Sequence, residues 1–442
     1  MTKKEIISGW NPVKRLLSPV IAELPPLFWP RTKAKALIAE GKIEKAKYLL
    51  ACYPKSHRAR TMMEALEERE REREREREVV PPTQFFHNDK HFNFIYRADI
   101  SNEDSICSDN FIDRLIHAYI ASADDFFRSC GTDVEASTSW EKKFFGDIKA
   151  DIHDCVYQER DVQKVKKLLS DPHNSELWLG FHVPTRQGQM KDQNVAQALG
   201  KWDFDILYRL AEAVGAHRCW DPQHGVPQTG PDADTLVREL EDYFGVELEF
   251  PTPYPHMSGV KTLRGLAGHR GIWGLYAAWL FKRLGARKVL EIGAGLGWAA
   301  YHAATFGVRD YHIVDIPLTA LASSHFLGLA RGENSVRLYG EENREAESAH
   351  DIRYTIVPPN AFPEDQRFDV VINMDSLTEM PRETAESYIA GIKKVTNMFI
   401  SINHEANPFT VAELLAKDPD VKHYTRNAFW LRRGYVEEVF EF

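Results

Sequence analysis

The C-terminal part of the chain alternates between short apolar runs and segments of helical periodicity. Apolar positions spaced by three and four predict helices at 298–306, 382–395 and 410–417. The apolar runs between them predict strands at 287–292, 310–315, 353–357, 368–374 and 397–402. Strands that alternate with helices in this way form a parallel sheet. Two last runs, 421–431 and 435–442, flank a turn at 432–434 and predict an antiparallel pair.

The first half of the chain has a different pattern. Apolar residues at helical spacing in 111–120, 202–211 and 232–244 predict that 81–255 is mostly helical. We expect this part to be a cap domain that binds the acceptor, that is, the molecule on which the protein acts. Residues 1–80 combine an aromatic arm, a helical hairpin at 33–52 and a run of alternating Glu and Arg at 68–78. Like charges at i,i+4 offset the favourable pairs in that run, which predicts a solvated helix or spacer. Residues 256–442 are the predicted cofactor-binding domain, entered through a helix at 261–284.

Three alternate glycines follow the first predicted strand. Gly293, Gly295 and Gly297 allow a sharp turn that brings backbone N–H groups against a ligand. The dinucleotide fingerprint G-x-G-x-x-G/A requires a small residue at position 298, where this chain has Trp298. The spacing is instead E-x-G-x-G-x-G, beginning at Glu291.

The strand after the glycine turn ends on Asp315. An acidic residue about 20 positions after such a turn meets a ribose in nucleotide-binding α/β folds, so Asp315 is predicted to accept the ribose hydroxyls. The alternative is that Asp315 caps the helix that begins at Pro317. The turn at Pro359 offers Asn360 and Phe362 to an adenine ring, or is a proline turn with an Asn cap.

The E-x-G-x-G-x-G segment resembles the first motif of class I S-adenosylmethionine-dependent methyltransferases. Segments 373–381, 401–408 and 432–435 are similar to the sugar O-methyltransferases of bacterial polysaccharide and glycolipid pathways. The resemblance implies a Rossmann-like, doubly wound and mostly parallel seven-stranded sheet with an antiparallel C-terminal hairpin. It also implies S-adenosyl-L-methionine as cofactor and a sugar or glycan hydroxyl as methyl acceptor. The predicted cofactor contacts are Glu291, Gly293, Ala294, Gly295, Gly297, Asp315, Asn360, Ala361 and Met374.

Acid and base side chains follow the fourth and fifth strands. A sugar hydroxyl needs a group that takes its proton, and ligands lie beyond the C-terminal ends of the strands. His404 is the predicted general base, with Asp375 or Glu379 orienting it or holding the sugar's other hydroxyls. Asp375 and Asn403 could instead only bond loop amides, and His404 could be a hydrogen-bonded core residue. A divalent metal is possible but not predicted, because the chain has no compact ligand motif.

Three basic residues of the predicted helix at 261–284 could reach the cofactor's carboxylate, although the pattern does not set them apart from solvated helix residues. They are Arg264, His269 and Arg270.

Composition narrows the possible partners. The 442 residues carry a net charge of −9, which argues against a non-specific nucleic-acid partner. Five widely spaced cysteines are typical of reduced thiols in a cytoplasmic protein, and no apolar run is long enough for a membrane span. The N-terminal helices could form a homo-oligomer. Two alternatives stay open, methylation of another small hydroxylated or amino acceptor and a non-catalytic assembly module.

Overall fold

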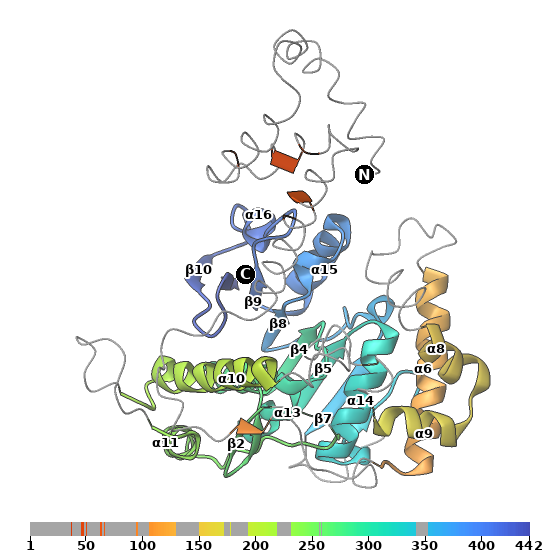
Figure 1. The fold of residues 1–442 in the computed structure, drawn as a ribbon. Helices are drawn as coiled ribbons and strands as arrows, with labels where there is room; N and C mark the ends of the chain where they lie inside the picture. The colour runs from red at the N-terminus through yellow and green to blue at the C-terminus, as the bar shows by residue number, and fades with distance from the viewer. Residues whose placement is uncertain are drawn as a thin grey trace, which may run out of the picture. The chain divides into compact units, whose positions relative to one another are not determined.

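The structure is a computed structural model (Figure 1). It describes residues 37, 46, 47, 50, 62, 63, 66, 94, 95, 106–129, 150–171, 177, 193–218, 231–255, 257, 259–341 and 352–442. The chain forms two compact units, Met1–Pro81 and Pro82–Phe442. In the first unit, Ala46, Leu50 and Leu66 form a small buried cluster. The predicted aromatic arm, the charged run at 68–78 and most of the helical hairpin lie outside the described residues.

An eight-stranded sheet forms the centre of the second unit, in the order β10-β11-β9-β8-β4-β5-β7-β6. Its strands are β4 (Lys288–Ile292), β5 (Asp310–Val314), β6 (Val336–Arg337), β7 (Arg353–Val357), β8 (Val370–Met374), β9 (Met398–His404), β10 (His423–Ala428) and β11 (Tyr435–Glu441). β11 lies antiparallel to both β9 and β10, and the other neighbouring pairs are parallel. The predicted doubly wound, mostly parallel, Rossmann-like sheet with its antiparallel C-terminal hairpin is confirmed. The eighth strand, β6, has two residues at the sheet edge and gives no apolar run to detect.

The chain reverses its direction of travel across the sheet at β4. It passes from β4 to β5 and β7 on one side, then returns to place β8 on the other side of β4. Ligands of open α/β sheets bind in the crevice outside the strand ends at this kind of switch point. The turn after β4 and the loop after β8 are therefore neighbours, because their strands are paired along Val289–Ile292.

Helices cover both faces of the sheet (Figure 1). They include α12 (His269–Arg283), α13 (Trp298–Thr305), α14 (Pro317–Arg331), α15 (Arg382–Val395) and α16 (Val411–Leu415). α12 and α13 pack closely, because a Cβ on Gly274 would lie 2.6 Å from the carbonyl carbon of Trp298. Thr410 and Glu413 form a capping box at the start of α16.

The predicted helix at 261–284 is wrong in its first eight residues. A small antiparallel sheet, β1-β2-β3, occupies this part, and α12 begins only at His269. Its strands are β1 (Phe94–Ile95), β2 (Gly259–Thr262) and β3 (Gly265–Ala267). Gly265 has φ +105°, and the Thr262 hydroxyl donates to its carbonyl, so a tight hairpin forms where the apolar spacing suggested a helix.

Most of the described residues between 106 and 255 are helical, as the apolar spacing in 111–120, 202–211 and 232–244 predicts. It contains α6 (Asp109–Ser129), α8 (Ala150–His153), a π-helical turn η3 (Asp154–Glu159), α9 (Val162–Ser170), α10 (Gln193–Val214) and α11 (Ala233–Phe244). α6 packs on α14, where the ring of Phe111 fills the space that a Cβ on Gly328 would need. The division into domains at 80 and 255 stays a prediction. None of the described helices combines the length and apolar character that crossing a bilayer requires.

Candidate active site

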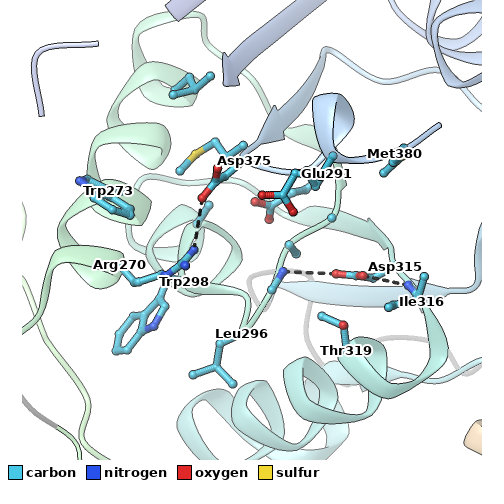
Figure 2. Close-up of a pocket in the computed structure, with 18 of the residues that line it drawn as sticks. Arg270, Trp273, Glu291, Leu296, Trp298, Asp315, Ile316, Thr319, Asp375 and Met380 are labelled. Carbon is cyan, nitrogen blue, oxygen red and sulfur yellow. Dashed lines mark hydrogen bonds and ion pairs between the residues drawn. The ribbon is translucent and has the colours of Figure 1, made fainter. Parts of the chain in front are cut away.

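A cavity of about 500 Å³ opens at the C-terminal ends of β4, β5 and β8. Figure 2 shows Arg270, Trp273 and Asp375 on one side of it and Asp315, Ile316 and Thr319 on the other. Its walls also contain side chains from segments far apart in the chain, among them Phe126, Glu291, Trp298, Asn360, Met374, Glu379, Tyr388, Phe429, Arg432 and Tyr435. This volume lies within the usual range for small-molecule sites.

The glycine turn forms the floor between the two sides. Gly293, Ala294 and Gly295 line the cavity, whereas Gly297 starts α13 from a left-handed conformation with φ +89°. A Cβ on Gly293 would lie 2.1 Å from Ser376 Oγ, in the loop after β8. Ser376 Oγ in turn accepts from Asn373 Nδ2 at 2.5 Å, and Asn403 Nδ2 donates to Asn373 Oδ1 at 2.8 Å. These side chains connect the ends of the neighbouring strands β4, β8 and β9.

Asp315 follows β5 and bonds to the glycine turn. Its Oδ2 accepts from the Gly295 N–H at 3.2 Å, and its Oδ1 accepts from the Ile316 N–H at 2.8 Å (Figure 2). The residue is only 8% exposed yet lines the cavity. A carboxylate fixed in this way presents its remaining lone pairs to hydroxyl donors such as those of a ribose.

Glu291 lies inside β4 and also faces the cavity. Tyr311 donates its hydroxyl hydrogen to Glu291 Oε2 at 2.8 Å. Burial raises the pKa of Glu291 to about 7, and the Tyr311 hydrogen bond opposes this shift only in part. Glu291 therefore changes its protonation state near neutral pH.

The turn after β7 brings one of its predicted residues to the cavity. Asn360 lines the wall from the 3-10 turn η7 (Pro359–Ala361), and Ala361 is not among the lining residues. Phe362 packs on α15, where a Cβ on Gly391 would lie 3.0 Å from its ring. Aromatic side chains that do line the cavity near α15 and α6 are Tyr388 and Phe126. Phe126 lies far from every recognisable motif, so the sequence gives no local signal for it.

Asp375 lies at the end of β8 in a strained conformation. Its φ is +60°, which is uncommon for a residue other than glycine. Its Oδ2 accepts from Arg432 Nη1 at 2.6 Å and its Oδ1 accepts from the Tyr435 hydroxyl at 2.5 Å. The Arg432 guanidinium lies over the rings of Tyr435 and Trp273, at 3.8 Å and 4.6 Å from their centres. Asp375 is thus held by the terminal hairpin, a pairing that the sequence does not indicate.

Glu379 and His404 form a second acid-base pair. Glu379 lines the cavity from the 3-10 turn η8 (Leu377–Glu379), and His404 is not among the lining residues. His404 Nε2 lies 3.9 Å from Glu379 Oε1, and His404 Nδ1 accepts from the Ala406 N–H at 3.3 Å. The structure therefore brings together the predicted catalytic residues, with Glu379 on the wall and His404 behind it.

The three predicted catalytic residues also have side-chain types that bind metal ions. Asp375, Glu379 and His404 each offer an atom within 4.8 Å of the others. However, both oxygens of Asp375 already accept hydrogen bonds, and Arg270 lies 3.9 Å from Asp375 Oδ2 in addition to Arg432. Two guanidinium groups beside this carboxylate oppose the binding of a further cation.

Of the three basic residues considered for the cofactor's carboxylate, only Arg270 lines the cavity. Arg264 pairs with Glu241 at 2.7 Å, and His269 bonds to buried Asp203 at 2.9 Å. Arg270 Nε is buried without a hydrogen-bond partner. Burial lowers the pKa of Arg270, and Asp375 opposes the shift while Arg432 adds to it. An anionic group in the cavity would stabilise this side chain.

No known protein family matches this chain, and no curated protein matches it. Solved structures that match part of this chain include an O-methyltransferase from Bacillus cereus in complex with SAH, 14% identical over 48% of this chain and 91% of that one, with a TM-score of 0.28. A magnesium protoporphyrin IX methyltransferase from Synechocystis PCC 6803 with bound SAM is 14% identical over 55% and 97%, with a TM-score of 0.28. A methyltransferase from Geobacter sulfurreducens is 14% identical over 38% and 77%, with a TM-score of 0.26.

Proposed function

We propose that this protein is an S-adenosylmethionine-dependent O-methyltransferase that methylates a hydroxyl group of a sugar or glycan. The observation that supports this most directly is the shared cavity. It joins the glycine turn and Asp315, which suit a nucleoside, to Glu379, a carboxylate that can accept a proton. The predicted E-x-G-x-G-x-G segment forms the floor between them.

The residues of the cavity suit this cofactor. Asp315 would hold the ribose hydroxyls and Asn360 the adenine, while the backbone of Gly293 and Gly295, which line the cavity, would face the ligand. Arg270, with its enclosed and unpaired Nε, would hold the carboxylate of the cofactor. Glu291, Ala294 and Met374 line the same cavity, and Gly297 and Ala361 would support the turns beside it.

When bound, the cofactor supplies an electrophilic methyl group on a sulfonium. The chain must then orient an acceptor hydroxyl and take its proton. Glu379, a carboxylate in the wall of the cavity, would take that proton. Asp375, which accepts from Arg432 and Tyr435, would help to hold this side of the cavity in place. His404, whose Nε2 lies 3.9 Å from Glu379 Oε1, would orient this carboxylate. This assigns the direct contact to Glu379 and a positioning role to His404.

The acceptor side of the cavity has features that suit a sugar. Trp273, Phe429 and Tyr435 contribute aromatic atoms to the wall, with the Arg432 guanidinium over the rings of Trp273 and Tyr435. Glu379 and Arg432 add charged hydrogen-bonding groups. Trp430, next to Phe429 in the terminal hairpin, is 60% exposed. Sugars present apolar C–H faces and polar edges, which such a mixture of side chains can contact.

A Glu379→Gln variant tests the assignment of the proton acceptor. The amide keeps the shape of the side chain but cannot take a proton, so we expect kcat to fall by about 10²-fold or more. Binding of the cofactor should change little. The matched control is Glu383→Gln, an exposed residue at the start of α15 that does not line the cavity. Near-full turnover of Glu379→Gln would contradict the assignment and favour an amino acceptor, which needs no such base.

A methyl-transfer screen over nucleotide-linked sugars and glycans, with and without a chelator, tests the acceptor class. We expect methylation of a hydroxylated sugar that is insensitive to the chelator, because both oxygens of Asp375 are engaged by Arg432 and Tyr435. Activity restricted to non-sugar acceptors would contradict the sugar assignment. Loss of activity with chelator, restored by a divalent metal, would contradict the expectation that methyl transfer needs no metal.

A further inference from the structure

Helix α6 lies alongside α14 (Figure 1), and the two helices run in opposite directions. Near the start of α6, the Phe111 ring occupies the space that a Cβ on Gly328 would need, close to the end of α14. Toward the end of α6, Ser122 lines a small gap together with Pro317, the first residue of α14. These two contacts establish the antiparallel arrangement.

The end of α6 extends past the start of α14. A helix rises about 1.5 Å per residue, so Phe126 lies about 22 Å along α6 from Phe111. Pro317 lies only about 16 Å along α14 from Gly328, the residue opposite Phe111. Phe126 is therefore about 6 Å beyond the first residue of α14, at the level of Asp315 in the turn that leads into that helix. Phe126 and Asp315 both line the cavity.

Polar contacts hold α6 in place along its length. Arg114 forms a double hydrogen bond with Glu341, from Nε at 2.6 Å and from Nη2 at 3.1 Å. Near the other end of the helix, the Tyr339 hydroxyl donates to Asp125 Oδ2 at 2.8 Å. Phe126 directly follows Asp125 and is only 4% exposed. The packing of α6 therefore sets the position of the Phe126 ring in the cavity wall.

The turn after β7 lies beside the same end of α6. Pro358, just before η7, lines the small gap together with Ser122 of α6, and Asn360 of η7 lines the cavity. Phe126 thus shares the cavity wall with the two side chains that suit a nucleoside, Asn360 for the adenine and Asp315 for the ribose. A phenylalanine ring can stack on a purine or meet its edge.

We propose that Phe126 is a cofactor-binding residue whose ring contacts the adenine base, so that α6 forms one wall of the nucleoside site. This inference rests on the proposed function, because it assumes that a nucleoside cofactor occupies the cavity. It gives a helix that precedes the whole eight-stranded sheet a part in binding the cofactor, in a region where the sequence predicts contacts with the acceptor.

Calorimetric titrations of the full chain with S-adenosylhomocysteine and with 5′-methylthioadenosine test this contact. The second ligand has the same nucleoside but lacks the amino and carboxylate groups. In Phe126→Ala we expect both ligands to bind at least about tenfold more weakly and by the same factor, because they share the base that loses its contact. In Arg270→Met only S-adenosylhomocysteine should bind more weakly, because only this ligand has a carboxylate. Phe126→Leu keeps an apolar side chain in the packed wall and should weaken both ligands by a smaller common factor, about threefold.

The matched control is Phe111→Leu. Phe111 is a fully buried phenylalanine of the same helix and does not line the cavity. This variant should lower the midpoint of thermal unfolding and leave both affinities unchanged. If it weakened the two ligands as much as the Phe126 variants do, the effect would come only from the packing of α6, and the inference would be overturned.

The inference is also overturned if both Phe126 variants bind 5′-methylthioadenosine as tightly as the unmodified protein does. In that case the proposed function would stand, since the unmodified protein would still bind the nucleoside. Failure of the unmodified protein to bind S-adenosylhomocysteine at all would instead overturn the proposed function, and this inference with it.

Discussion

At the scale of single residues, the raised pKa of Glu291 makes the stability of the fold depend on pH. Its pKa rises from the ordinary 4.5 to about 7 in the folded chain. Between these two values the folded protein keeps a proton that the unfolded chain has released. Stability contributed by this group is therefore present below pH 4.5 and decreases as the pH rises toward 7, by about 3 kcal/mol in total.

A Glu291→Gln variant should remove this pH dependence. We expect the variant to gain stability relative to the unmodified protein as the pH is raised from 5 to 8, by up to about 3 kcal/mol. Denaturant unfolding of both proteins at the two pH values measures the difference, and effects of other titrating groups cancel. If the stability difference between the variant and the unmodified protein were the same at pH 5 and pH 8, folding would not raise the pKa of Glu291.

The sequence indicates only some of the residues that form the site. Asp315 and Glu379 can be found because Asp315 ends one predicted strand and Glu379 lies in the segment after another, and strand ends meet at one edge of a parallel sheet. The contacts of Asp375 with Arg432 and Tyr435 cannot, because they join positions 57 and 60 residues apart through the terminal hairpin. Pairings of this kind depend on tertiary structure that no local pattern encodes.

At the scale of elements, the close packing of α12 on α13 aligns Arg270 with the glycine turn. It depends on Gly274, where a Cβ would lie 2.6 Å from a backbone atom of Trp298 and 2.7 Å from the backbone nitrogen of Ala299. Gly391 in α15 is a matched position, but its nearest neighbour is the ring edge of Phe362 at 3.0 Å. A side chain can move aside more easily than a backbone.

We therefore expect Gly274→Ala to destabilise the fold by about 1–3 kcal/mol, despite a helix-propensity gain of about 1 kcal/mol. Gly391→Ala should change stability by less than about 1 kcal/mol, since the same gain offsets a small movement of Phe362. Thermal or denaturant unfolding compares the two variants. Equal effects would contradict the account of α12–α13 packing.

Elements were predictable where their pattern is long and regular. The strands β4, β5, β7, β8 and β9 read as apolar runs because they are buried on both faces of the sheet. The hairpin of β2 and β3 was missed because its apolar positions also fit a helix that continues into α12. Gly265 has a positive φ, which a helix does not allow, so this segment forms two short strands and not a helix.

At the scale of the whole molecule, the cavity combines parts of the chain that are distant in sequence. Phe126 comes from the N-terminal helices, Trp273 from the helix before the sheet and Phe429 from the terminal hairpin. The part of the cavity beside β4 and β5 could be predicted from nearby motifs. Its aromatic wall could not, because Phe126, Trp273 and Phe429 come from these separate segments.

The most direct test of which cofactor the cavity binds is a calorimetric titration of the full chain with S-adenosylhomocysteine and, separately, with NAD. We predict one binding site per chain for the first ligand and none for the second. Asp315→Asn should weaken binding of S-adenosylhomocysteine about tenfold or more, because a charged acceptor for the ribose hydroxyls is lost. Asp310→Asn, at the other end of β5, should not affect binding. Tight binding of NAD, or no binding of S-adenosylhomocysteine, would contradict the account.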